Sequence, residues 1–192
     1  MRSKQNIIRF VKHKHQDQYR AGKVPVWHHL AHVSQILEYV LKYTKEGGVE
    51  EREIMKMAAW GHDILEDTEA MQTEIEEMFG KRGYHIIRGM TNELGDRYKK
   101  RYIAQMVRSE ETIRLIKLSD LHDNITSALY NFDRLGAKWM TSYFLPIVTP
   151  MRKAIAKTKF KKYKRSAMLL LAMVELSASL LDEEVRIYKK NK

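Results

Sequence analysis

Apolar residues recur three and four positions apart along almost the whole chain, which is the spacing of one face of an α-helix. The 192 residues include only 9 Gly and 3 Pro, too few for a chain built from many tight turns. Because 44% of the residues are hydrophobic, the chain can bury a core, which excludes a disordered or fibrous protein. We therefore predict one all-α domain over residues 1–192, without strands.

The helical spacing also places the individual helices. It predicts them near residues 7–11, 30–41, 54–65, 73–79, 84–90, 97–107, 109–121, 136–157 and 163–188. The apolar run from Ala167 to Leu181 is shorter than the roughly 20 residues of a membrane span, so we expect it to be a buried helix. Met1 to His15 is polar and basic and lacks the apolar run of a secretory signal. These features predict a soluble, cytoplasmic protein without a membrane partner.

Composition limits the chemistry that the chain can perform. The absence of Cys excludes a disulfide scaffold, a zinc ribbon and thiol catalysis, so any metal must sit on His, Asp or Glu. The net charge of +11 favours anionic partners such as nucleotides. The basic excess is concentrated between Arg152 and Arg165, where eight Lys or Arg occur without an acid, and we expect an exposed helix or an interface there.

Residues 61–68, Gly-His-Asp-Ile-Leu-Glu-Asp-Thr, are the most informative segment. His62 and Asp63 stand at the end of an apolar run, and Glu66 and Asp67 follow each of them four residues later. If the helix continues through this segment, each pair lies on neighbouring helix faces. Such crowding of carboxylates around an imidazole is costly without a cation. The alternative is a solvated helix end that carries these acids by chance.

Two residues elsewhere in the chain favour the cation. His29 begins an amphipathic helix, and Asp120 interrupts the apolar run 113–121, where a charged residue needs a partner. Together with His62 and Asp63 they offer two imidazoles and two carboxylates. That mixture suits a divalent transition ion such as Mn²⁺ or Fe²⁺ with positions left open for water and substrate.

Four ordered stretches carry a resemblance to a known family. Residues 15–25 are similar to an HxxQxR…G.P segment, and residues 29–37 to an HPxxVAxIL helix. Residues 62–68 match the signature HDxxEDT fully, and residues 117–124 resemble KLADxxxN. The chain thus resembles the HD-domain phosphohydrolases, and within them the RelA/SpoT-type alarmone hydrolases and their small single-domain relatives. The resemblance implies an all-α HD-domain bundle with a family-like core over about residues 5–130 and additional C-terminal helices over 131–192.

The resemblance also implies roles for residues. It implies metal ligands at His29, His62, Asp63 and Asp120. It implies an acidic pair, Glu66 and Asp67, that orients and deprotonates the attacking water. Substrate contacts are implied at Arg20 and Asn124, and we add Lys99 and Lys100 as candidates to face the substrate's phosphates. We predict a Mn²⁺-dependent enzyme that removes pyrophosphate from the 3′ position of ppGpp or pppGpp.

Departures from the family pattern keep other functions open. The family usually has Tyr in place of Val26, Pro in place of Leu30, and Arg-Leu-His in place of residues 121–123. These changes flank the pocket and favour, as an alternative, another nucleotide substrate: a deoxynucleotide, an adenine alarmone or NADPH. A second alternative is a non-catalytic module that binds nucleic acid or a partner through residues 152–165. His122 and Asp123 are candidates to support the metal ligands, and we expect His32 to be packed or solvent-facing.

Overall fold

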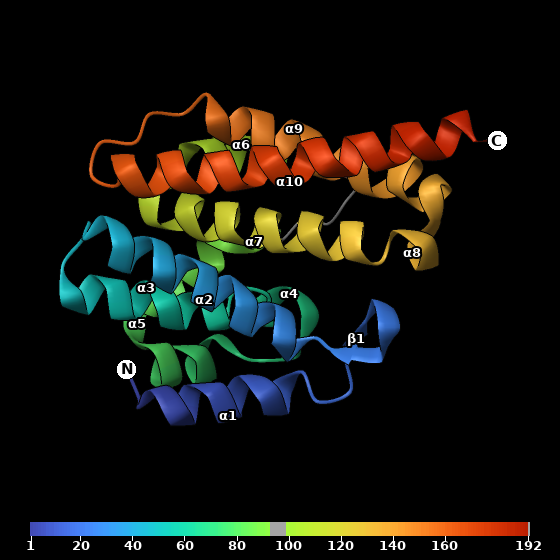
Figure 1. Cartoon of the computed structure of the whole chain (residues 1–192). Helices are drawn as coiled ribbons and strands as arrows, with labels where there is room; N and C mark the ends of the chain where they lie inside the picture. Colours follow the sequence, from blue (N-terminus) through green and yellow to red (C-terminus); the bar gives the residue numbers. More distant parts are fainter. Residues whose placement is uncertain (93–98, 192) are drawn as a thin grey trace.

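The protein is a bundle of helices in which α7 runs through the middle (Figure 1). The structure, a computed structural model, describes residues 1–92 and 99–191. The described elements are α1 (Lys4–Lys14), β1 (Tyr19–Arg20), η1 (Ala21–Lys23), β2 (Val24–Pro25), α2 (Trp27–Thr44), α3 (Val49–Trp60), α4 (Ile64–Asp67), α5 (Gln72–Met90), α6 (Lys99–Arg108), α7 (Glu111–Tyr130), α8 (Phe132–Trp139), η3 (Met140–Phe144), α9 (Leu145–Ala156) and α10 (Lys164–Lys190). The all-α prediction is confirmed.

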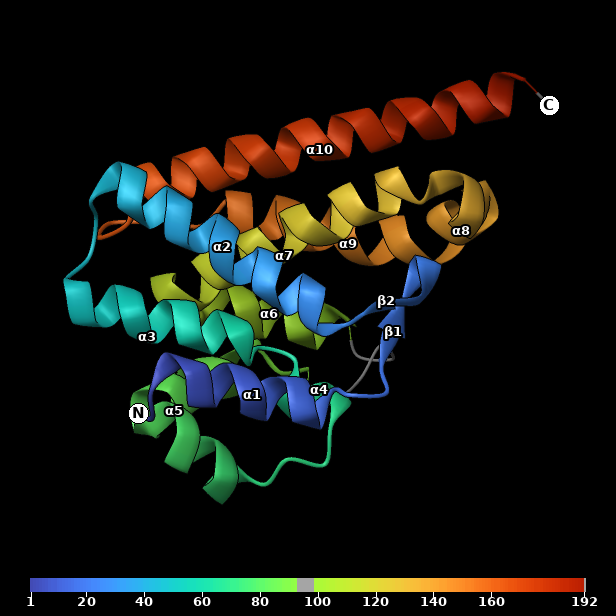
Figure 2. The ribbon, with the colours of Figure 1, turned by 60° about the horizontal axis from the view of Figure 1, so that its bottom comes forward.

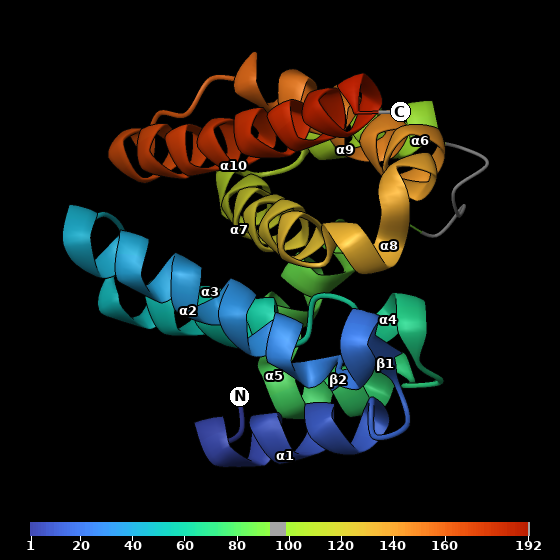
Figure 3. The same ribbon diagram turned by 45° about the vertical axis from the view of Figure 1, so that its right-hand side comes forward.

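Helix α7 forms the centre of the core because apolar side chains project from several of its faces. Ile116, Leu118 and Ile125 are fully buried, and most of the other apolar residues of α7 are nearly so. Helices α9 and α10 cover one side of α7, and α2, α3 and α5 lie on the other (Figure 3). A helix with buried residues on several faces must have neighbours on both sides. Polar residues that α7 carries are therefore held inside the bundle.

The segment from α3 to α4 differs from the expected continuous helix. Helix α3 ends at Trp60, and α4 begins only at Ile64, so Gly61, His62 and Asp63 form a turn. A side chain at Gly61 would not fit, since a Cβ atom there would lie 2.6 Å from Cζ of Phe79. The apolar spacing continues through the turn, which is why periodicity did not reveal the break. The expectation that a continuous helix stacks His62 on Glu66 and Asp63 on Asp67 is wrong.

Other expected elements are present with altered bounds. The two helices expected at 73–79 and 84–90 are the two parts of α5, which a kink separates at Gly80, where the backbone is not helical and φ is +71°. Residues 19–20 and 24–25 form a two-residue antiparallel ribbon that is too short to show an alternating pattern. The start of the helix expected at 97–107 lies outside the described residues, and α6 is described from Lys99. The η1 turn between the two strands contacts α8 at one end of the bundle (Figure 2).

The basic segment 152–165 is anchored by two glutamates from distant parts of the chain. Glu111 accepts hydrogen bonds from the backbone N–H groups of Lys161, Lys162 and Tyr163. Glu46 accepts them from Arg165 and Ser166 at the start of α10, where helices have unpaired N–H groups. At the other end of the segment, the buried Arg152 is paired with Glu175 and lies 3.7 Å from Asp182. Three of its eight basic residues, Lys161, Lys162 and Arg165, thus attach the start of α10 to the bundle through their backbone, and a fourth, Arg152, joins α9 to α10.

Helix α10 is buried on one face only, which corrects the expectation of a buried helix. Leu170, Val174 and Leu181 are fully buried, whereas Leu176 and Leu180 are 65% and 52% exposed. The outer face is open in Figure 2, where α10 lies along the edge of the molecule. None of the helices in the described part of the chain combines the length and the apolar character that crossing a bilayer requires.

Candidate metal and active site

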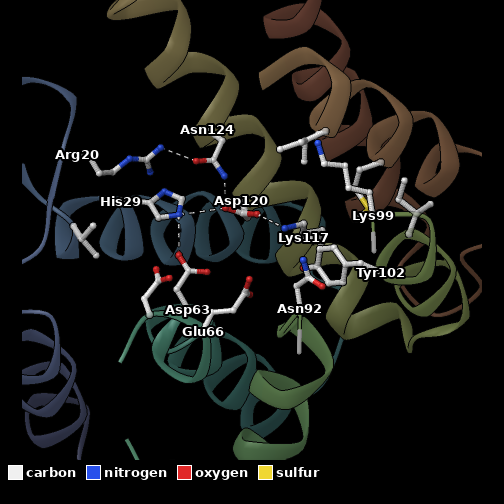
Figure 4. A pocket seen from close by; sticks show the side chains of 15 residues that line it. Arg20, His29, Asp63, Glu66, Asn92, Lys99, Tyr102, Lys117, Asp120 and Asn124 are labelled. Atoms are coloured by element: carbon white, nitrogen blue, oxygen red, sulfur yellow. Dashed lines mark hydrogen bonds and ion pairs between the residues drawn. The ribbon is translucent and has the colours of Figure 1, made fainter. Parts of the chain in front are cut away.

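A cavity of about 360 Å³ opens beside α7. Eight of the ten residues singled out from the sequence line it: Arg20, His29, Asp63, Glu66, Asp67, Lys99, Asp120 and Asn124 (Figure 4). His62 is buried next to this lining, with 1% of its surface exposed. Lys100 is exposed and is not part of the lining. The ribbon, α2, α4, α6 and α7 therefore bring together residues that are far apart in the sequence.

The four expected metal ligands converge at the bottom of this cavity. His29, His62 and Asp63 each present a ligand atom within 4.8 Å of the others. Asp120 completes the group, since its Oδ1 lies 3.2 Å from Nε2 of His29 and 3.5 Å from Nε2 of His62. Nε2 of His62 also lies 3.1 Å from Oδ1 of Asp63. Figure 4 shows His29, Asp63 and Asp120 turned toward one another.

The Nδ1 atoms of His29 and His62 already make hydrogen bonds. Nδ1 of His29 donates to Oδ2 of Asp123 at 2.6 Å, and Nδ1 of His62 donates to the backbone carbonyl of Ala59 at 2.8 Å. Because these partners only accept hydrogen bonds, each Nδ1 carries a proton, and in the neutral ring Nε2 then carries a lone pair. Both lone pairs face carboxylate oxygens. Nε2 of His62 is buried and has no hydrogen-bond partner among the described residues.

Such an arrangement of lone pairs needs a positive charge between them. In the absence of a metal, a proton supplies it: burial lowers the pKa of His62, but Asp63 and Asp120 outweigh burial and raise it well above its usual value. Burial likewise raises the pKa of Asp63, and the nearby His62 and His29 overcome this effect and hold it at about 2. Two imidazole nitrogens and two ionised carboxylates fit a divalent transition ion.

Lys117 adds a cation at the edge of the ligand group. Its Nζ lies 2.8 Å from Oδ2 of Asp120 and 5.2 Å from the centre of the Tyr102 ring. Burial raises the pKa of Asp120, but Lys117, followed by the two histidines, holds it well below its usual range. Asp120 therefore stays ionised inside the protein, as a metal ligand must.

Arg20 and Asn124 form a second, connected part of the site. Nη2 of Arg20 donates to Oδ1 of Asn124 at 2.6 Å, and Nδ2 of Asn124 donates to Oδ1 of Asp120 at 2.6 Å. The two dashed contacts are visible in Figure 4. The guanidinium of Arg20 is thus held at the cavity wall beside the ligand group, with part of its surface open to solvent.

Glu66 and Asp67 lie on the opposite wall, on α4. Burial raises the pKa of Glu66 above its usual value, and the negative charge of Asp63 adds to the effect. The same two causes raise the pKa of Asp67. The broken helix positions the pair: backbone N–H groups of both residues donate to the carbonyl of Asp63 across the turn. Carboxylates whose pKa lies closer to neutrality are better proton acceptors for catalysis.

Some residues of the site could not be found from sequence motifs. Asn92, Tyr102, Ile147 and Met151 also line the cavity. Tyr102 donates to the carbonyl of Met90, and burial raises its pKa to about 12. Ile147 and Met151 come from α9, beyond the region of resemblance, so only the tertiary structure brings them here.

Of the two candidate supporting residues, Asp123 contacts the expected ligand His29, whereas Nδ1 of His122 lies 3.3 Å from Oγ of Ser177. His32 is largely exposed, as expected.

Comparisons with known proteins identify two sequence relatives of this chain. No family model matches the chain. It is 32% identical over 123 residues to the guanosine-3′,5′-bis(diphosphate) 3′-pyrophosphohydrolase MESH1 of Drosophila melanogaster, covering 62% of this chain and 65% of that one. It is 30% identical over 155 residues to the guanosine-3′,5′-bis(diphosphate) 3′-pyrophosphohydrolase of Aquifex aeolicus, covering 77% of this chain and 20% of that one. The chain thus spans just under two thirds of the first relative and a fifth of the second.

A solved structure extends the agreement to the fold. The structure of a metazoan orthologue of SpoT, described as hydrolysing ppGpp, superposes with a TM-score of 0.70 at 22% identity, covering 94% of this chain and 98% of that one. The chain thus shares the helical fold of that structure, and the side chains of His29, His62, Asp63 and Asp120 converge within it. Both sequence relatives of this chain are named guanosine-3′,5′-bis(diphosphate) 3′-pyrophosphohydrolases.

Proposed function

We propose that this protein is a metal-dependent hydrolase that removes pyrophosphate from the 3′ position of ppGpp or pppGpp. The observation that carries the proposal is the buried pair of imidazole Nε2 atoms facing two ionised carboxylates, next to the raised-pKa acids Glu66 and Asp67. The names of both sequence relatives support the same substrate. In this proposal His29, His62, Asp63 and Asp120 hold the ion, with Mn²⁺ as the expected metal.

The ion, when bound, lowers the pKa of water and polarises a phosphoryl oxygen. Glu66 and Asp67 face the cavity beside Asp63, and one of them accepts the proton of the attacking water. The water oxygen forms a bond to the phosphorus attached to the 3′ oxygen, and the bond between that phosphorus and the 3′ oxygen breaks. The 3′ oxygen takes up a proton, which leaves GDP or GTP and pyrophosphate.

Two cationic side chains of the cavity are suited to bind the terminal phosphates and the base of this substrate. Lys99 lines the cavity on the side of α6 and is suited to contact the terminal phosphates, where positive charge offsets the charge of the leaving group. Arg20, fixed by Asn124, presents a planar guanidinium that suits stacking on a nucleobase. Lys100 lies outside the cavity lining, so nothing in the geometry supports its role as a substrate contact.

A second candidate is hydrolysis of another nucleotide by the same site. Val26 lines the cavity at a position where the family pattern usually has Tyr, so the wall near Arg20 differs in shape and polarity. The scaffold of HD-domain proteins does not by itself fix the substrate, because function depends on the site and not on the fold. A deoxynucleotide, an adenine alarmone or NADPH therefore belongs in the test.

The test is product release from a panel of nucleotides by metal-free protein, with added Mn²⁺ and with chelator. We expect pyrophosphate from ppGpp, lost with chelator and reduced at least 100-fold in Asp63→Asn, because this substitution removes a charged ligand. Lys153→Gln, on the exposed surface of α9, is the matched control and should keep full activity. Product release from another nucleotide alone would support the metal site and show that the substrate is that nucleotide and not ppGpp. Inactivity toward the whole panel would contradict the proposal.

A further inference from the structure

Asp123 occupies a junction on α7 between the two parts of the site. Its Oδ2 accepts a hydrogen bond from Nδ1 of His29 at 2.6 Å and lies 3.6 Å from Nη1 of Arg20. Its Oδ1 lies 3.3 Å from Nδ1 of His32. The Asp123 side chain is only 12% exposed, so these contacts are made largely out of water. The residue belongs to the triplet 121–123, where this chain departs from the usual family pattern.

We propose that Asp123 is a positioning residue that fixes the ring and the tautomer of His29 and so strengthens divalent-metal binding, an inference that rests on the metal site of the proposed function. A carboxylate that accepts from Nδ1 keeps the proton there and leaves the lone pair of Nε2 for a metal. Its negative charge also makes the imidazole a stronger donor to a cation.

His29 and His62 differ in the group that accepts the hydrogen bond from Nδ1. Nδ1 of His62 is bound by the backbone carbonyl of Ala59, which no side-chain substitution can remove. Nδ1 of His29 depends on the Asp123 side chain. A substitution at Asp123 therefore changes the support of one ligand while it leaves the other intact.

Asp123 also links the metal ligands to Arg20. Arg20 donates to Asn124, which donates to Asp120, while Asp123 contacts both Arg20 and His29. These contacts form a closed ring, since Nε2 of His29 returns to Asp120 at 3.2 Å. The consecutive residues 123 and 124 thus connect the guanidinium to two different metal ligands. Loss of the Asp123 carboxylate should therefore weaken the positioning of both His29 and Arg20.

The direct test is calorimetric titration of metal-free protein with Mn²⁺ in the absence of nucleotide. We expect Asp123→Ala to weaken Mn²⁺ binding about 10- to 100-fold, the usual effect of removing a group that supports a metal-bound histidine. Asp123→Asn should give a smaller loss, because its amide oxygen can still accept from His29. Asp133→Asn makes the same chemical change on the exposed surface of α8 and should bind Mn²⁺ like the unaltered protein.

Two further measurements separate positioning from general stability. Circular dichroism and the thermal midpoint show whether each variant is folded. In folded Asp123→Ala, the visible absorption bands of bound Co²⁺ should shift, because the geometry at His29 changes. Unchanged Mn²⁺ affinity and unchanged Co²⁺ bands in folded Asp123→Ala would overturn the proposal.

The result does not depend on the substrate. If the unaltered protein binds Mn²⁺ and fails to hydrolyse ppGpp, the proposed activity is wrong and the role of Asp123 is still decided by the titration. If the unaltered protein binds neither Mn²⁺ nor Co²⁺, both the metal site and the role of Asp123 are refuted.

Discussion

Replacing Lys117 with Met should change the stability and the metal affinity of the protein in opposite directions. The ammonium of Lys117 lies 2.8 Å from Asp120, and the two side chains are 15% and 5% exposed. Breaking a buried ion pair by removing one partner costs about 3–5 kcal/mol. Asp120 keeps its hydrogen bond from Asn124, so we expect the lower end, about 3 kcal/mol. For a chain of this size that loss lowers the melting temperature by roughly 6–12 °C.

The same substitution should strengthen metal binding although it lowers the stability of the fold. Lys117 and a bound cation compete for the negative charge of Asp120, so Mn²⁺ should bind more tightly to Lys117→Met, by about tenfold or 1.4 kcal/mol. The assay is differential scanning calorimetry of metal-free protein, with and without Mn²⁺, and the exposed Lys153→Met is the control. A metal-free melting temperature equal to that of the unaltered protein, or weaker Mn²⁺ binding, would refute this reasoning.

Three further predictions follow from the same structure. Burial and Asp63 raise the pKa of Glu66, so its ionisation in the folded protein opposes folding above its usual titration range. Glu66→Gln should therefore raise the melting temperature at pH 7 but not at pH 4, while kcat falls about 10²- to 10⁴-fold; a loss of stability at pH 7 would contradict this sign. Gly61→Ala should destabilise the fold by about 1–3 kcal/mol and weaken Mn²⁺ binding, because the added methyl group collides with Phe79 beside the turn that carries His62. An unchanged free energy of unfolding in chemical denaturation would disprove the tight fit. Arg152→Met should lower the melting temperature by a few degrees, because the buried guanidinium loses its ion pairs with two half-exposed carboxylates, whereas Lys153→Met should not. Equal values for both variants would mean that the ion pairs contribute nothing.

The sequence contained most of the information about the fold class and the position of the ligands. Helical spacing predicted an all-α chain, and this is confirmed by the structure and by the solved relative. The motif residues His29 and Asp120 are brought together because α2 packs against α7, and the turn that follows α3 adds Asp63. Their assignment as metal ligands stays a prediction until an ion is bound and measured.

The remaining features depend on tertiary contacts that periodicity does not register. The turn at Gly61 interrupts a helix although the apolar spacing continues through it, and Phe79 packs so close to Gly61 that a Cβ atom there would not fit. The half-exposed α10 shows the same limit: an apolar run indicates a helix, but its neighbours decide which faces are covered. The lining contributed by Met151 comes from a segment without motif resemblance, and only packing of α9 against α7 places it at the cavity.

The most direct test of the account is a titration of metal-free protein with Mn²⁺ while pyrophosphate release from ppGpp is followed. Because the described ligands form one convergent group, activity should rise from zero and saturate as the first equivalent of Mn²⁺ binds each chain. His62→Gln should need much more Mn²⁺ or remain inactive, since it removes the buried nitrogen that has no hydrogen-bond partner among the described residues. Full activity in metal-free, chelator-treated protein, or in His62→Gln without added Mn²⁺, would contradict a metal-dependent hydrolase at this site.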